Sequence, residues 1–572
     1  MNESLPLAER HFQDSRFAWP TALAFSLLAT LALLIPFFWL GSASGHDFEF
    51  HVASWLDVAY QWRHGVLFPR WTFWSNYGFG EPRYIFYPPL SWILGAALTV
   101  IAPISWVPAA FILLTQTFAG AAAYALLRRL TTPRGACFGA AFYAINPYAI
   151  LLSYVRSDFA EQLACAIFPL LLLAALRLAG LLDGEHPGLP SIPSFAIPFA
   201  AVWLCNAPAG VMASYSMTLL FAVAAVSKRS WKIFLRSTAA LALGFGLSTF
   251  YLLPAAYEER WVNIGQALSS GLLPFQNFLF TNIDDVEHTW FNWVSSIAAV
   301  VLILFAALAT LASRKFARET SASPSAKRTW RILLLLGVAC TVLMLRPTVF
   351  LWNILPQLRY IQFPWRWMSF LAVICCCFLA AVVERRRGWL AFVLVVALSI
   401  PLAVFLGENT WWDPDEMPTQ QAAVVSGKGF EGVDEYDPLG DDHLDLASQA
   451  PLAVALAAHA NPASRAQPLP AKIDVKLWLP EKKELVVDSP EPARVALRLL
   501  DYPAWRVTVN GRGVTPVRTR GVDQMFVPIS AGISEIEIRF VRTPDRSAGI
   551  AVSVLCCLLG IGLLGSRKRM AS

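Results

Sequence analysis

Long apolar runs constrain most strongly what this chain can fold into. The first extends from Trp19 to Leu40 and is long enough to cross a lipid bilayer as a helix. Similar runs recur along the chain, in which 56% of the residues are hydrophobic and only 15% are charged. A soluble globular domain has no use for that much apolar surface. The sequence therefore predicts a polytopic α-helical membrane protein.

Positive charge orients the predicted spans, because short cytoplasmic loops are rich in Lys and Arg. If the segment 90–101 crossed the bilayer, Arg128, Arg129 and the C-terminal Arg567 would face outward. Prolines bracket this segment of about a dozen residues, so we interpret it as a re-entrant or surface helix. About twelve spans remain: 19–41, 107–128, 135–151, 161–182, 192–207, 209–226, 231–253, 291–313, 329–345, 367–383, 389–406 and 548–565.

The same pattern divides the chain into domains. Residues 1–18 are expected to be a cytoplasmic tail, because the first apolar run suits a signal anchor better than a cleaved signal. A transmembrane domain follows over 19–406, with a first outer loop at 42–106. Residues 407–546 are expected to be extracytoplasmic, and 547–572 to form the final span and a basic cytoplasmic tail.

Composition also excludes several classes of function. The formal net charge of +6 belongs to the loops and does not indicate nucleic-acid binding. The nine cysteines lie inside or at the ends of apolar runs without a CxxC pair, so neither a disulfide framework nor a zinc site is predicted. The sequence has no Gly-rich phosphate loop, HExxH or GxSxG motif, so the soluble-enzyme mechanisms that use them are not supported.

Unusual polar residues collect at the outer ends of the predicted spans. Asp47 follows the first span directly, and a carboxylate at that position is costly to keep unless it has a function. The outer segments 154–161, 257–261 and 356–367 also carry carboxylates or arginines, whereas the span interiors are almost free of charge. Solvated loop charges or an aromatic interface belt would explain any one segment. Because all share one side, we expect a common cavity.

The composition changes after Gly407. Residues 408–446 hold eleven acidic side chains and one Lys, which is typical of a solvated acidic linker. A calcium site at Asp434, Glu435, Asp437, Asp441 and Asp442 is an alternative, although EF-hand spacing is missing. Alternating apolar and polar residues then predict a small β-sandwich with a hairpin turn at Asn510-Gly511. Its strands are expected at 472–479, 494–500, 505–509, 525–529 and 535–540.

These residue types suit group transfer from a lipid-linked phosphate donor. A carboxylate could take the proton of an acceptor hydroxyl, and arginines could hold the leaving phosphate in bidentate fashion. A sugar leaving a phosphate passes through an oxocarbenium-like state. The base must then lie opposite the leaving group and need not form a covalent bond.

The order of short motifs resembles a known family. The motifs are GHDFEFH, FPRW, GFGEPRYIFYPPL, RSDFAEQ, YLLPAAYEERWVN, LRYIQFPWRW, GVDEYDP and YPAWRVTVNG, ahead of a final span. Over nearly the whole chain they resemble the membrane proteins labelled 6-pyruvoyl-tetrahydropterin-synthase-related, close to the YfhO-like group of the GT-C glycosyltransferase superfamily. The pterin label implies no pterin chemistry, because the eight scattered histidines give no zinc triad.

The resemblance implies a GT-C-like fold, a polyprenyl-phosphate sugar as donor, and specific site residues. Asp47 becomes the candidate general base and His51 its orienting partner, with Asp158 and Glu161 as further acidic groups. The implied donor phosphate ligands are Arg156, Arg359 and Arg366, and the implied acceptor ligands are Glu258, Glu259 and Tyr87. Structural alternatives are helix capping by Asp47, an Arg156–Asp158 ion pair, and lipid-headgroup anchoring by Arg359 and Arg366.

The leading hypothesis is an integral-membrane glycosyltransferase of the bacterial cytoplasmic membrane. It would move a sugar from a polyprenyl-phosphate donor to a lipid or cell-envelope glycan on the outer face, in contact with membrane lipids and not with nucleic acid. No metal ligands are assigned, because the first outer loop lacks a paired-Asp signature, but a divalent metal stays an alternative. A non-catalytic flippase or glycan-binding scaffold is the rival. A flippase would carry charge along a path through its spans, which these spans lack.

Overall fold

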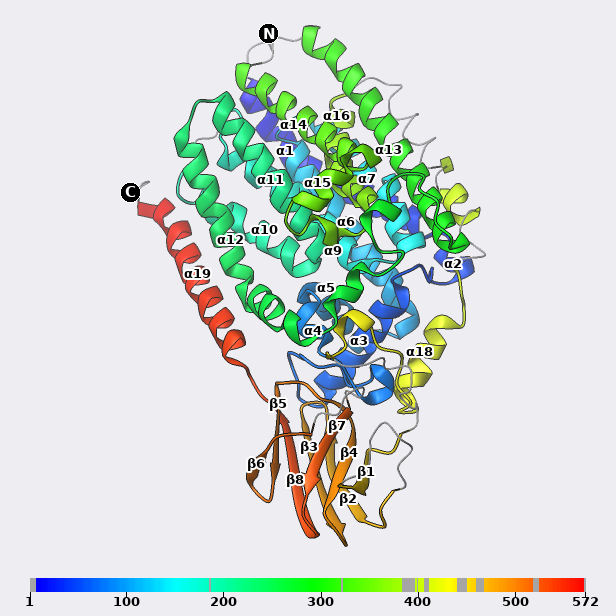
Figure 1. Cartoon of the computed structure of the whole chain (residues 1–572). Coiled ribbons are helices and arrows are strands. Elements are labelled where there is room, and N and C mark those ends of the chain that lie inside the picture. Colours follow the sequence, from blue (N-terminus) through cyan, green and yellow to red (C-terminus); the bar gives the residue numbers. More distant parts are fainter. Residues whose placement is uncertain are drawn as a thin grey trace.

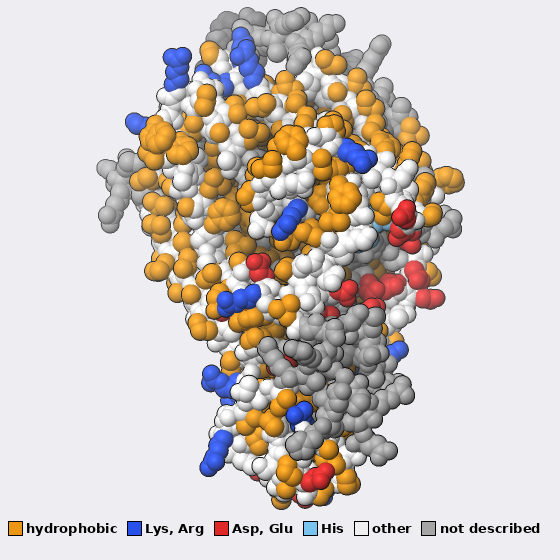
Figure 2. Space-filling view, viewed as in Figure 1, with side chains coloured by type: hydrophobic (Ala, Val, Ile, Leu, Met, Phe, Trp, Pro, Cys, Tyr) orange, Lys and Arg blue, Asp and Glu red, His pale blue; other side chains and the backbone are white. Residues whose placement is uncertain are grey.

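A body of helices and a domain of antiparallel strands lie end to end in the computed structural model (Figure 1). The structure describes residues 7–184, 187–319, 323–382, 397–398, 400–405, 411–439, 450–458, 468–517 and 524–569. The last helix, α19, runs back from the β domain along the helical body, where it packs against α12. Hydrophobic side chains cover most of the helical body in the space-filling view (Figure 2). Such a surface suits contact with lipid.

The helices follow the apolar runs. In chain order they are α1 (Leu7–Leu34), α2 (Phe37–Leu40), α3 (Phe48–Arg63), α4 (Arg83–Phe86), α5 (Pro89–Ile101), α6 (Val107–Leu127), α7 (Pro133–Ala144), α8 (Pro147–Leu151), α9 (Phe159–Leu178), α10 (Ser191–Cys205), α11 (Ala207–Ser227), α12 (Trp231–Glu258), α13 (Val286–Glu319), α14 (Pro324–Leu343), α15 (Val349–Ile354), α16 (Met368–Val382), α18 (Glu416–Val425) and α19 (Pro544–Arg569).

Within the described residues, 9 helical stretches are long and apolar enough to cross a membrane, or up to 10 if a bent pair counts as one span. Each of the 9 coincides with a predicted span. The described residues do not confirm the predicted total of about twelve. The predicted span 192–207 is the 15-residue helix α10, which has Pro198 inside it. The predicted span 329–345 is α14, which a 90° bend separates from Arg346–Ile354. The predicted span 389–406 lies largely outside the described residues.

The segment predicted as a re-entrant or surface helix is α5. It has 13 residues, which at about 1.5 Å per residue is shorter than the hydrocarbon core of a bilayer. It packs on α3, where a Cβ atom added to Gly95 would lie 2.0 Å from Trp55 Nε1. The first outer loop therefore contains two short helices in close contact.

A buried carboxylate organises the aromatic part of this loop. Asp57, on α3, is 0% exposed and accepts hydrogen bonds from the backbone amides of Phe73 (2.9 Å) and Trp74 (3.0 Å). The Gln61 amide (2.7 Å) and the Tyr84 hydroxyl (3.0 Å) also donate to it. Burial raises the pKa of Asp57 to about 6, although these hydrogen bonds oppose the rise. Asp57 thus holds the loop against α3.

The acidic segment after residue 407 is not a solvated linker throughout, which corrects the prediction. Residues 427–437 lie against residues 74–81 of the first outer loop, and we name the two segments together the loop clasp. The backbone of Phe430 pairs with Trp74 (3.0 Å) and Tyr77 (2.9 Å), and the buried Glu81 accepts from the amide of Val433 (2.9 Å). These bonds fix the late segment to the early loop.

The predicted calcium site is not supported by this arrangement. The Asp437 carboxylate accepts a hydrogen bond of 2.7 Å from the Asn76 side chain, and Asp441 and Asp442 lie outside the described residues. Among the residues that the structure describes, no group of three or more His, Cys, Asp or Glu could hold a metal ion.

The β domain contains antiparallel strands in two sheets. In the described residues the strands are β1 (Ala453–Ala457), β2 (Lys472–Leu479), β3 (Lys482–Ser489), β4 (Ala493–Leu500), β5 (Trp505–Val509), β6 (Arg512–Val514), β7 (Gln524–Ile529) and β8 (Gly532–Phe540). Their orders are β1-β4-β7 and β2-β3-β8-β5-β6. The predicted strands are all present, and buried residues of both sheets, such as Leu497 and Ile538, belong to one core. Asn510 (φ 50°) and Gly511 (φ 74°) make the predicted hairpin turn.

Candidate active site

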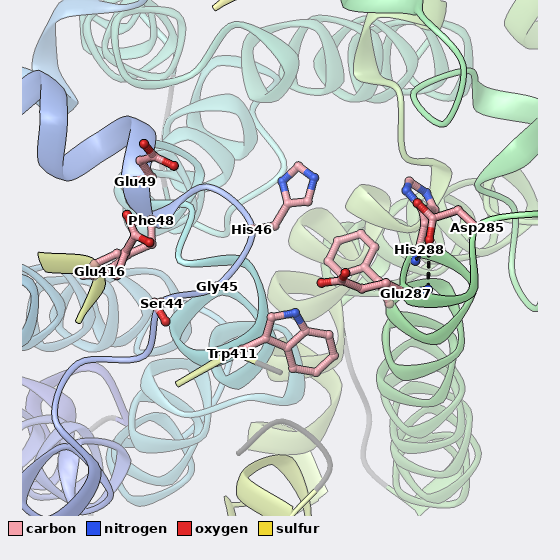
Figure 3. A pocket seen from close by; sticks show the side chains of 11 residues that line it. Ser44, Gly45, His46, Phe48, Glu49, Asp285, Glu287, His288, Trp411 and Glu416 are labelled. Carbon is pink, nitrogen blue, oxygen red and sulfur yellow. Dashed lines mark hydrogen bonds between the residues drawn. The ribbon is translucent and has the colours of Figure 1, made fainter. Parts of the chain in front are cut away.

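A cavity of about 320 Å³ lies where the first outer loop meets the start of α13 and α18 (Figure 3). Residues 44–46 of the loop line one side of it, together with Phe48 and Glu49. Residues near the start of α13 line the opposite side, and Trp411 and Glu416 complete it. The cavity therefore depends on three segments that are far apart in the sequence.

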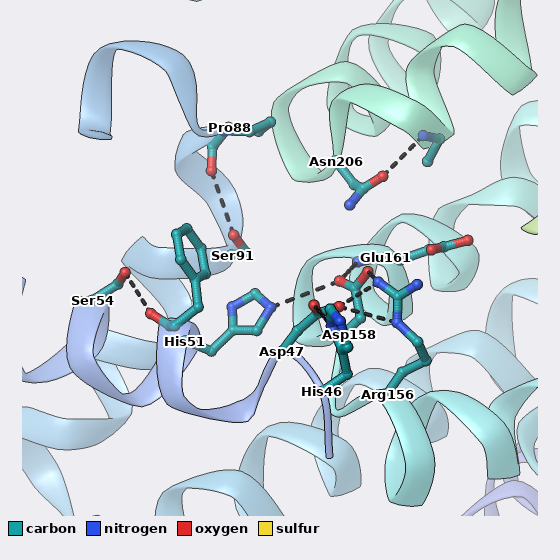
Figure 4. A network of polar contacts seen from close by, with 12 residues as sticks. His46, Asp47, His51, Ser54, Pro88, Ser91, Arg156, Asp158, Glu161 and Asn206 are labelled. Atoms are coloured by element: carbon teal, nitrogen blue, oxygen red, sulfur yellow. Dashed lines mark hydrogen bonds and ion pairs between the residues drawn. The ribbon is translucent and has the colours of Figure 1, made fainter. Parts of the chain in front are cut away.

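Charged side chains from separate segments meet in a network beside this cavity (Figure 4). Asp47 Oδ2 accepts from Arg156 Nε at 3.0 Å and also from Arg156 Nη2. Arg156 Nη2 donates in addition to Asp158 Oδ2 at 2.9 Å. Arg366 Nε lies 3.1 Å from Glu161 Oε2, and Arg366 Nη2 lies 3.5 Å from Asp158 Oδ2. The structure thus brings together residues predicted from three different motifs.

The turn between α8 and α9 explains why three of these side chains converge. A π-helical turn ends at Arg156, and Ser157 then adopts a left-handed conformation with φ 49°. Asp158 caps α9, because its Oδ1 accepts from the backbone amide of Glu161 at 2.8 Å. The tight turn places Arg156, Asp158 and Glu161 around one point at the ends of two spans.

The first outer loop is fixed against this turn by its backbone. The Asp47 amide donates to the Arg156 carbonyl (2.8 Å), and the Gly45 amide donates to Ser157 Oγ (3.0 Å). The approach at Gly45 is so close that an added Cβ would lie 2.4 Å from the Val155 carbonyl oxygen. Glycine at this position therefore sets the distance between Asp47 and Arg156.

We expect a Gly45→Ala substitution to displace the loop, because the new methyl group would collide with a backbone carbonyl. Overpacking of this kind costs about 1–3 kcal/mol, so the melting temperature of the detergent-solubilised protein should fall. Gly265→Ala is the matched control, since nothing lies within 4 Å of a Cβ atom added there. Equal melting temperatures for the two variants would contradict the close approach.

Asp47 is the most accessible carboxylate of the network. Its side chain is 23% exposed, whereas those of Arg156 (1%), Asp158 (3%) and Arg366 (6%) are buried. Burial alone would raise the pKa of Asp47, but the Arg156 guanidinium and then His46 hold it well below its usual value. Burial likewise opposes ionisation of Asp158, yet His51 and Arg156 lower its pKa. Both carboxylates are therefore charged at neutral pH.

The structure decides between some of the alternatives. Asp47 stands at the N-cap position of α3, but within the described residues its side chain makes no capping hydrogen bond, so the capping interpretation is wrong. The Arg156–Asp158 ion pair exists, and it is one part of the larger network. His51 does not orient Asp47 as predicted. Its Nε2 lies 3.7 Å from Asp158 Oδ1, at the start of α9.

The other predicted residues lie at different distances from the network. Tyr87 is at its edge, with its ring centroid 5.9 Å from that of His51. Arg359 is exposed and donates to the Tyr360 hydroxyl at 3.3 Å. Glu259 is also exposed, in the loop after α12. Arg359 and Glu259 therefore lie outside the network. The implied roles of Arg359 in binding the donor phosphate and of Glu259 in binding the acceptor stay predictions.

Glu258 lies outside the network, at the junction between α12, the β domain and α19. It is 0% exposed, and Arg546 Nε (2.7 Å) and Nη2 (2.8 Å) donate to its two oxygens. The Tyr502 hydroxyl donates to Oε2 at 2.6 Å. These bonds join the end of α12 to the β domain and to α19, so the carboxylate is occupied by protein groups.

Sequence reasoning missed two members of the site. His46 Nδ1 lies 2.7 Å from Asp47 Oδ1, and its place beside Asp47 in the GHD motif was an available signal. The Tyr148 hydroxyl donates to Glu161 Oε1 at 2.5 Å. Tyr148 sits within an apolar run, and nothing in the local pattern separates it from an ordinary core tyrosine.

The residues present do not fit a divalent metal. Asp47, the accessible carboxylate, is already paired with the positive charge of Arg156 and with His46. Among the described residues, no three or more His, Cys, Asp or Glu side chains are grouped so that they could hold a metal ion. A cation here would have to compete with a guanidinium for the same oxygen.

Comparison with known proteins gives one family and several solved structures. The model of the family described as "6-pyruvoyl-tetrahydropterin synthase related domain; membrane protein" matches residues 84–410. No curated protein matches the chain.

The similar solved structures share little sequence with this chain. Arabinofuranosyltransferase AftD from Mycobacteria is 17% identical, with a TM-score of 0.38, and the match covers 69% of this chain and 27% of that one. The oligosaccharyltransferase of Archaeoglobus fulgidus in its apo form is 15% identical, with a TM-score of 0.37. The match covers 73% of this chain and 56% of that one. ArnT from Cupriavidus metallidurans, bound to undecaprenyl phosphate, is 10% identical, with a TM-score of 0.31. The match covers 72% of this chain and 90% of that one. The chain thus matches 27% of the length of the first and 56% of the second.

Proposed function

This chain belongs to the membrane-protein family described as 6-pyruvoyl-tetrahydropterin synthase related, and from that premise we propose that it is a membrane glycosyltransferase of GT-C type. It would move a sugar from a polyprenyl-phosphate donor to a lipid or cell-envelope glycan. The site and the β domain would face the extracytoplasmic side of the bacterial cytoplasmic membrane. The observation that carries this proposal is Asp47, an accessible carboxylate held by a buried arginine at the end of a span.

Buried arginine supports a role in binding the donor phosphate. Arg156 Nη1 is buried and, among the described residues, has no hydrogen-bond partner. An unsatisfied guanidinium N–H is a strong donor for a phosphate oxygen. Arg366 Nη2 lies 3.5 Å from Asp158 Oδ2, the oxygen that Arg156 Nη2 also approaches, so two guanidinium groups meet at one point of the network. We assign both to the phosphate and give Arg359 no part in it.

In the proposed reaction the acceptor oxygen attacks the anomeric carbon of the donor sugar. The bond between that carbon and the phosphate oxygen breaks, and polyprenyl phosphate leaves with the electron pair. Positive charge develops on the sugar, so a negative carboxylate nearby lowers the barrier. Asp47 supplies that charge, and a base at the site takes the proton of the acceptor hydroxyl.

The position of the charges favours transfer over transport. Arg156 ends the span Pro133–Arg156, and Glu161 and Arg366 lie within the first turn of the spans Phe159–Leu178 and Pro364–Val382. A flippase needs polar groups along a path through the bilayer. Here the network is confined to the ends of the spans, where a lipid-linked phosphate headgroup would lie.

The test is transfer of label by membranes that carry the wild type or Asp47→Asn. Radiolabelled polyprenyl-phosphate hexose and polyprenyl-phosphate pentose serve as donors, and the membranes supply the acceptor. We expect transfer by the variant to fall about 100-fold at equal protein level. Asp474→Asn is the control, because Asp474 is 53% exposed on β2 and pairs only with Lys476 among the described residues. Equal transfer by wild type and Asp47→Asn would contradict the proposal.

A further inference from the structure

The cavity beside Asp47 has the size of a small-ligand site. Its volume of about 320 Å³ stands at the lower end of the range for such sites, roughly 300–1,000 Å³. Ser44, Gly45 and His46 line it on the side of the network, and His288 and Phe291 line it on the side of α13 (Figure 3). One sugar unit suits this volume better than an oligosaccharide does.

His46 connects the cavity with the charged network. Its Nδ1 lies 2.7 Å from Asp47 Oδ1, while the side chain is 42% exposed and lines the cavity. Its ring stacks on Phe291, with centroids 5.5 Å apart and planes 26° apart, and meets Phe363 edge-on. These contacts hold the imidazole with one nitrogen on Asp47, so the other nitrogen is the one that a ligand in the cavity can reach.

Asp47 itself is poorly suited to take a proton. Its Oδ2 accepts two N–H groups of Arg156, and such a pair favours the charged form of the carboxylate. Imidazole accepts protons near neutral pH, and a hydrogen-bonded carboxylate stabilises the imidazolium that forms. The arrangement therefore separates the proton acceptor from the group that stabilises its charge.

We propose that this cavity binds the acceptor sugar and that His46 takes the proton of the attacking hydroxyl, with Asp47 as its charge partner. The inference rests on the proposed function. The acceptor oxygen forms its bond to the anomeric carbon as the bond to the donor phosphate breaks. The hydroxyl proton moves to His46 Nε2, and Asp47 stays ionised. After the product leaves, the exposed imidazole returns the proton to water.

The cavity lining also limits the chemical class of the acceptor. Glu49, Asp285, Glu287 and Glu416 line it, and no Lys or Arg is among the described lining residues. Acidic side chains also gather on this side of the molecule in the space-filling view (Figure 2). Burial, and then the neighbouring Glu416, raise the pKa of Glu49, as expected where negative charges crowd. The field repels anions, so the acceptor is a neutral or amino-bearing sugar and not a uronic acid or a sugar phosphate.

Trp411 adds an aromatic surface to these carboxylates. Carboxylates accept hydrogen bonds from sugar hydroxyls or amines, and an aromatic ring packs against the apolar face of a sugar ring. A small cavity that offers both kinds of contact is suited to a single polar ring. The lining and the volume therefore point to the same class of ligand.

The first test separates the two residues of the pair. His46→Asn keeps a side-chain N–H that can donate to Asp47 but cannot take a proton at neutral pH. We expect label transfer to fall about 100-fold in this variant. The wild-type rate should fall as the pH is lowered, whereas the residual rate of His46→Asn should not, because the variant has no imidazole. The other titratable groups around His46 are unchanged in this variant: Asp47, which bonds to it, and the cavity residues Glu49, Asp285, Glu287, His288 and Glu416.

The control is His64→Asn, which replaces an exposed histidine at the end of α3 that bonds to the Tyr60 carbonyl. It should keep the wild-type rate and pH profile. If Asp47→Asn is inactive while His46→Asn keeps the wild-type rate and pH profile, Asp47 is the base. In that case this inference is overturned and the proposed function stands. If Asp47→Asn keeps full transfer, the proposed function itself fails.

The second test measures binding and needs no turnover. The purified full-length protein in detergent is titrated calorimetrically with methyl glucoside, methyl glucosaminide and methyl glucuronide. We expect the first two to bind at least tenfold more tightly than the glucuronide, and Trp411→Ala to weaken binding of both. Equal binding of the glucuronide, or no effect of Trp411→Ala, would overturn the assignment of the cavity.

Discussion

Replacing Arg156 with glutamine is expected to abolish label transfer and to destabilise the protein by about 3–5 kcal/mol, the cost of removing one partner from a buried charge pair. Arg156 bonds to Asp47 and Asp158 and is 1% exposed, so the variant leaves two carboxylates close together without their shared cation. Arg366, 3.5 Å from Asp158, cannot replace both contacts. Thermal unfolding in detergent and the transfer assay measure the two effects.

A double variant separates stability from function. In Arg156→Gln/Asp158→Asn one of the two unpaired charges is removed, so we expect part of the lost stability to return but no transfer. Arg359→Gln, at an exposed arginine, should match the wild type in both measurements. A single Arg156→Gln variant with wild-type melting temperature and rate would show that the network does not hold the loop.

The same network implies an acid limit to wild-type stability. The pKa of Asp47 is lowered in the folded protein from its ordinary 3.8, by Arg156 and His46 against the effect of burial. A lowered folded pKa contributes stability that is fully present above the unfolded value and is lost as the pH falls below it. Wild-type melting temperature should therefore decline below about pH 4, and Arg156→Gln should show a smaller decline.

Replacing Glu258 with alanine is expected to detach the β domain from the helical body. Glu258 and Arg546 are 0% and 3% exposed, and removing the carboxylate leaves a buried guanidinium without its bidentate partner. The expected loss is about 3–5 kcal/mol. Because the junction opens first, limited proteolysis should cut near Thr543 in the variant, under conditions in which the wild type stays intact.

Glu259→Ala is the matched control, since the neighbouring carboxylate is exposed. The experiment also distinguishes the two roles considered for Glu258. A structural role predicts altered proteolysis and melting temperature at any substrate concentration. A role in acceptor binding predicts a raised acceptor KM with unchanged stability, and that result would contradict the junction described above.

The sequence allowed the fold to be predicted where one physical signal dominated. Apolar runs placed each span that the structure describes as long enough to cross, and alternation placed strands such as β5. Prediction from the sequence failed where the local pattern of apolar and polar residues disagrees with the burial of the side chains. In β3, Lys483 is 2% exposed and donates to the carbonyls of Leu479 and Pro480, so a lysine occupies a position that the pattern assigns to solvent. β6 has three residues, too few for any period to be recognised.

The site was predictable to the extent that its residues share short motifs. Arg156, Asp158 and Glu161 stand in one motif and do meet Asp47. Glu258 and Glu259 look alike in the sequence, but one is buried because Arg546, 288 residues later, reaches it. Long-range partners of this kind leave no local trace. The same is true of Trp411 and Glu416, which complete a cavity that begins at Ser44.

The loop clasp has a consequence for biosynthesis. Glu81 accepts the amide of Val433, which the ribosome adds 352 residues later. At about 5–20 residues per second, translation of that stretch takes about 20–70 s. During this interval the early loop lacks the segment that covers it. Nascent chains should therefore need protection from proteases and aggregation until residue 437 has been synthesised.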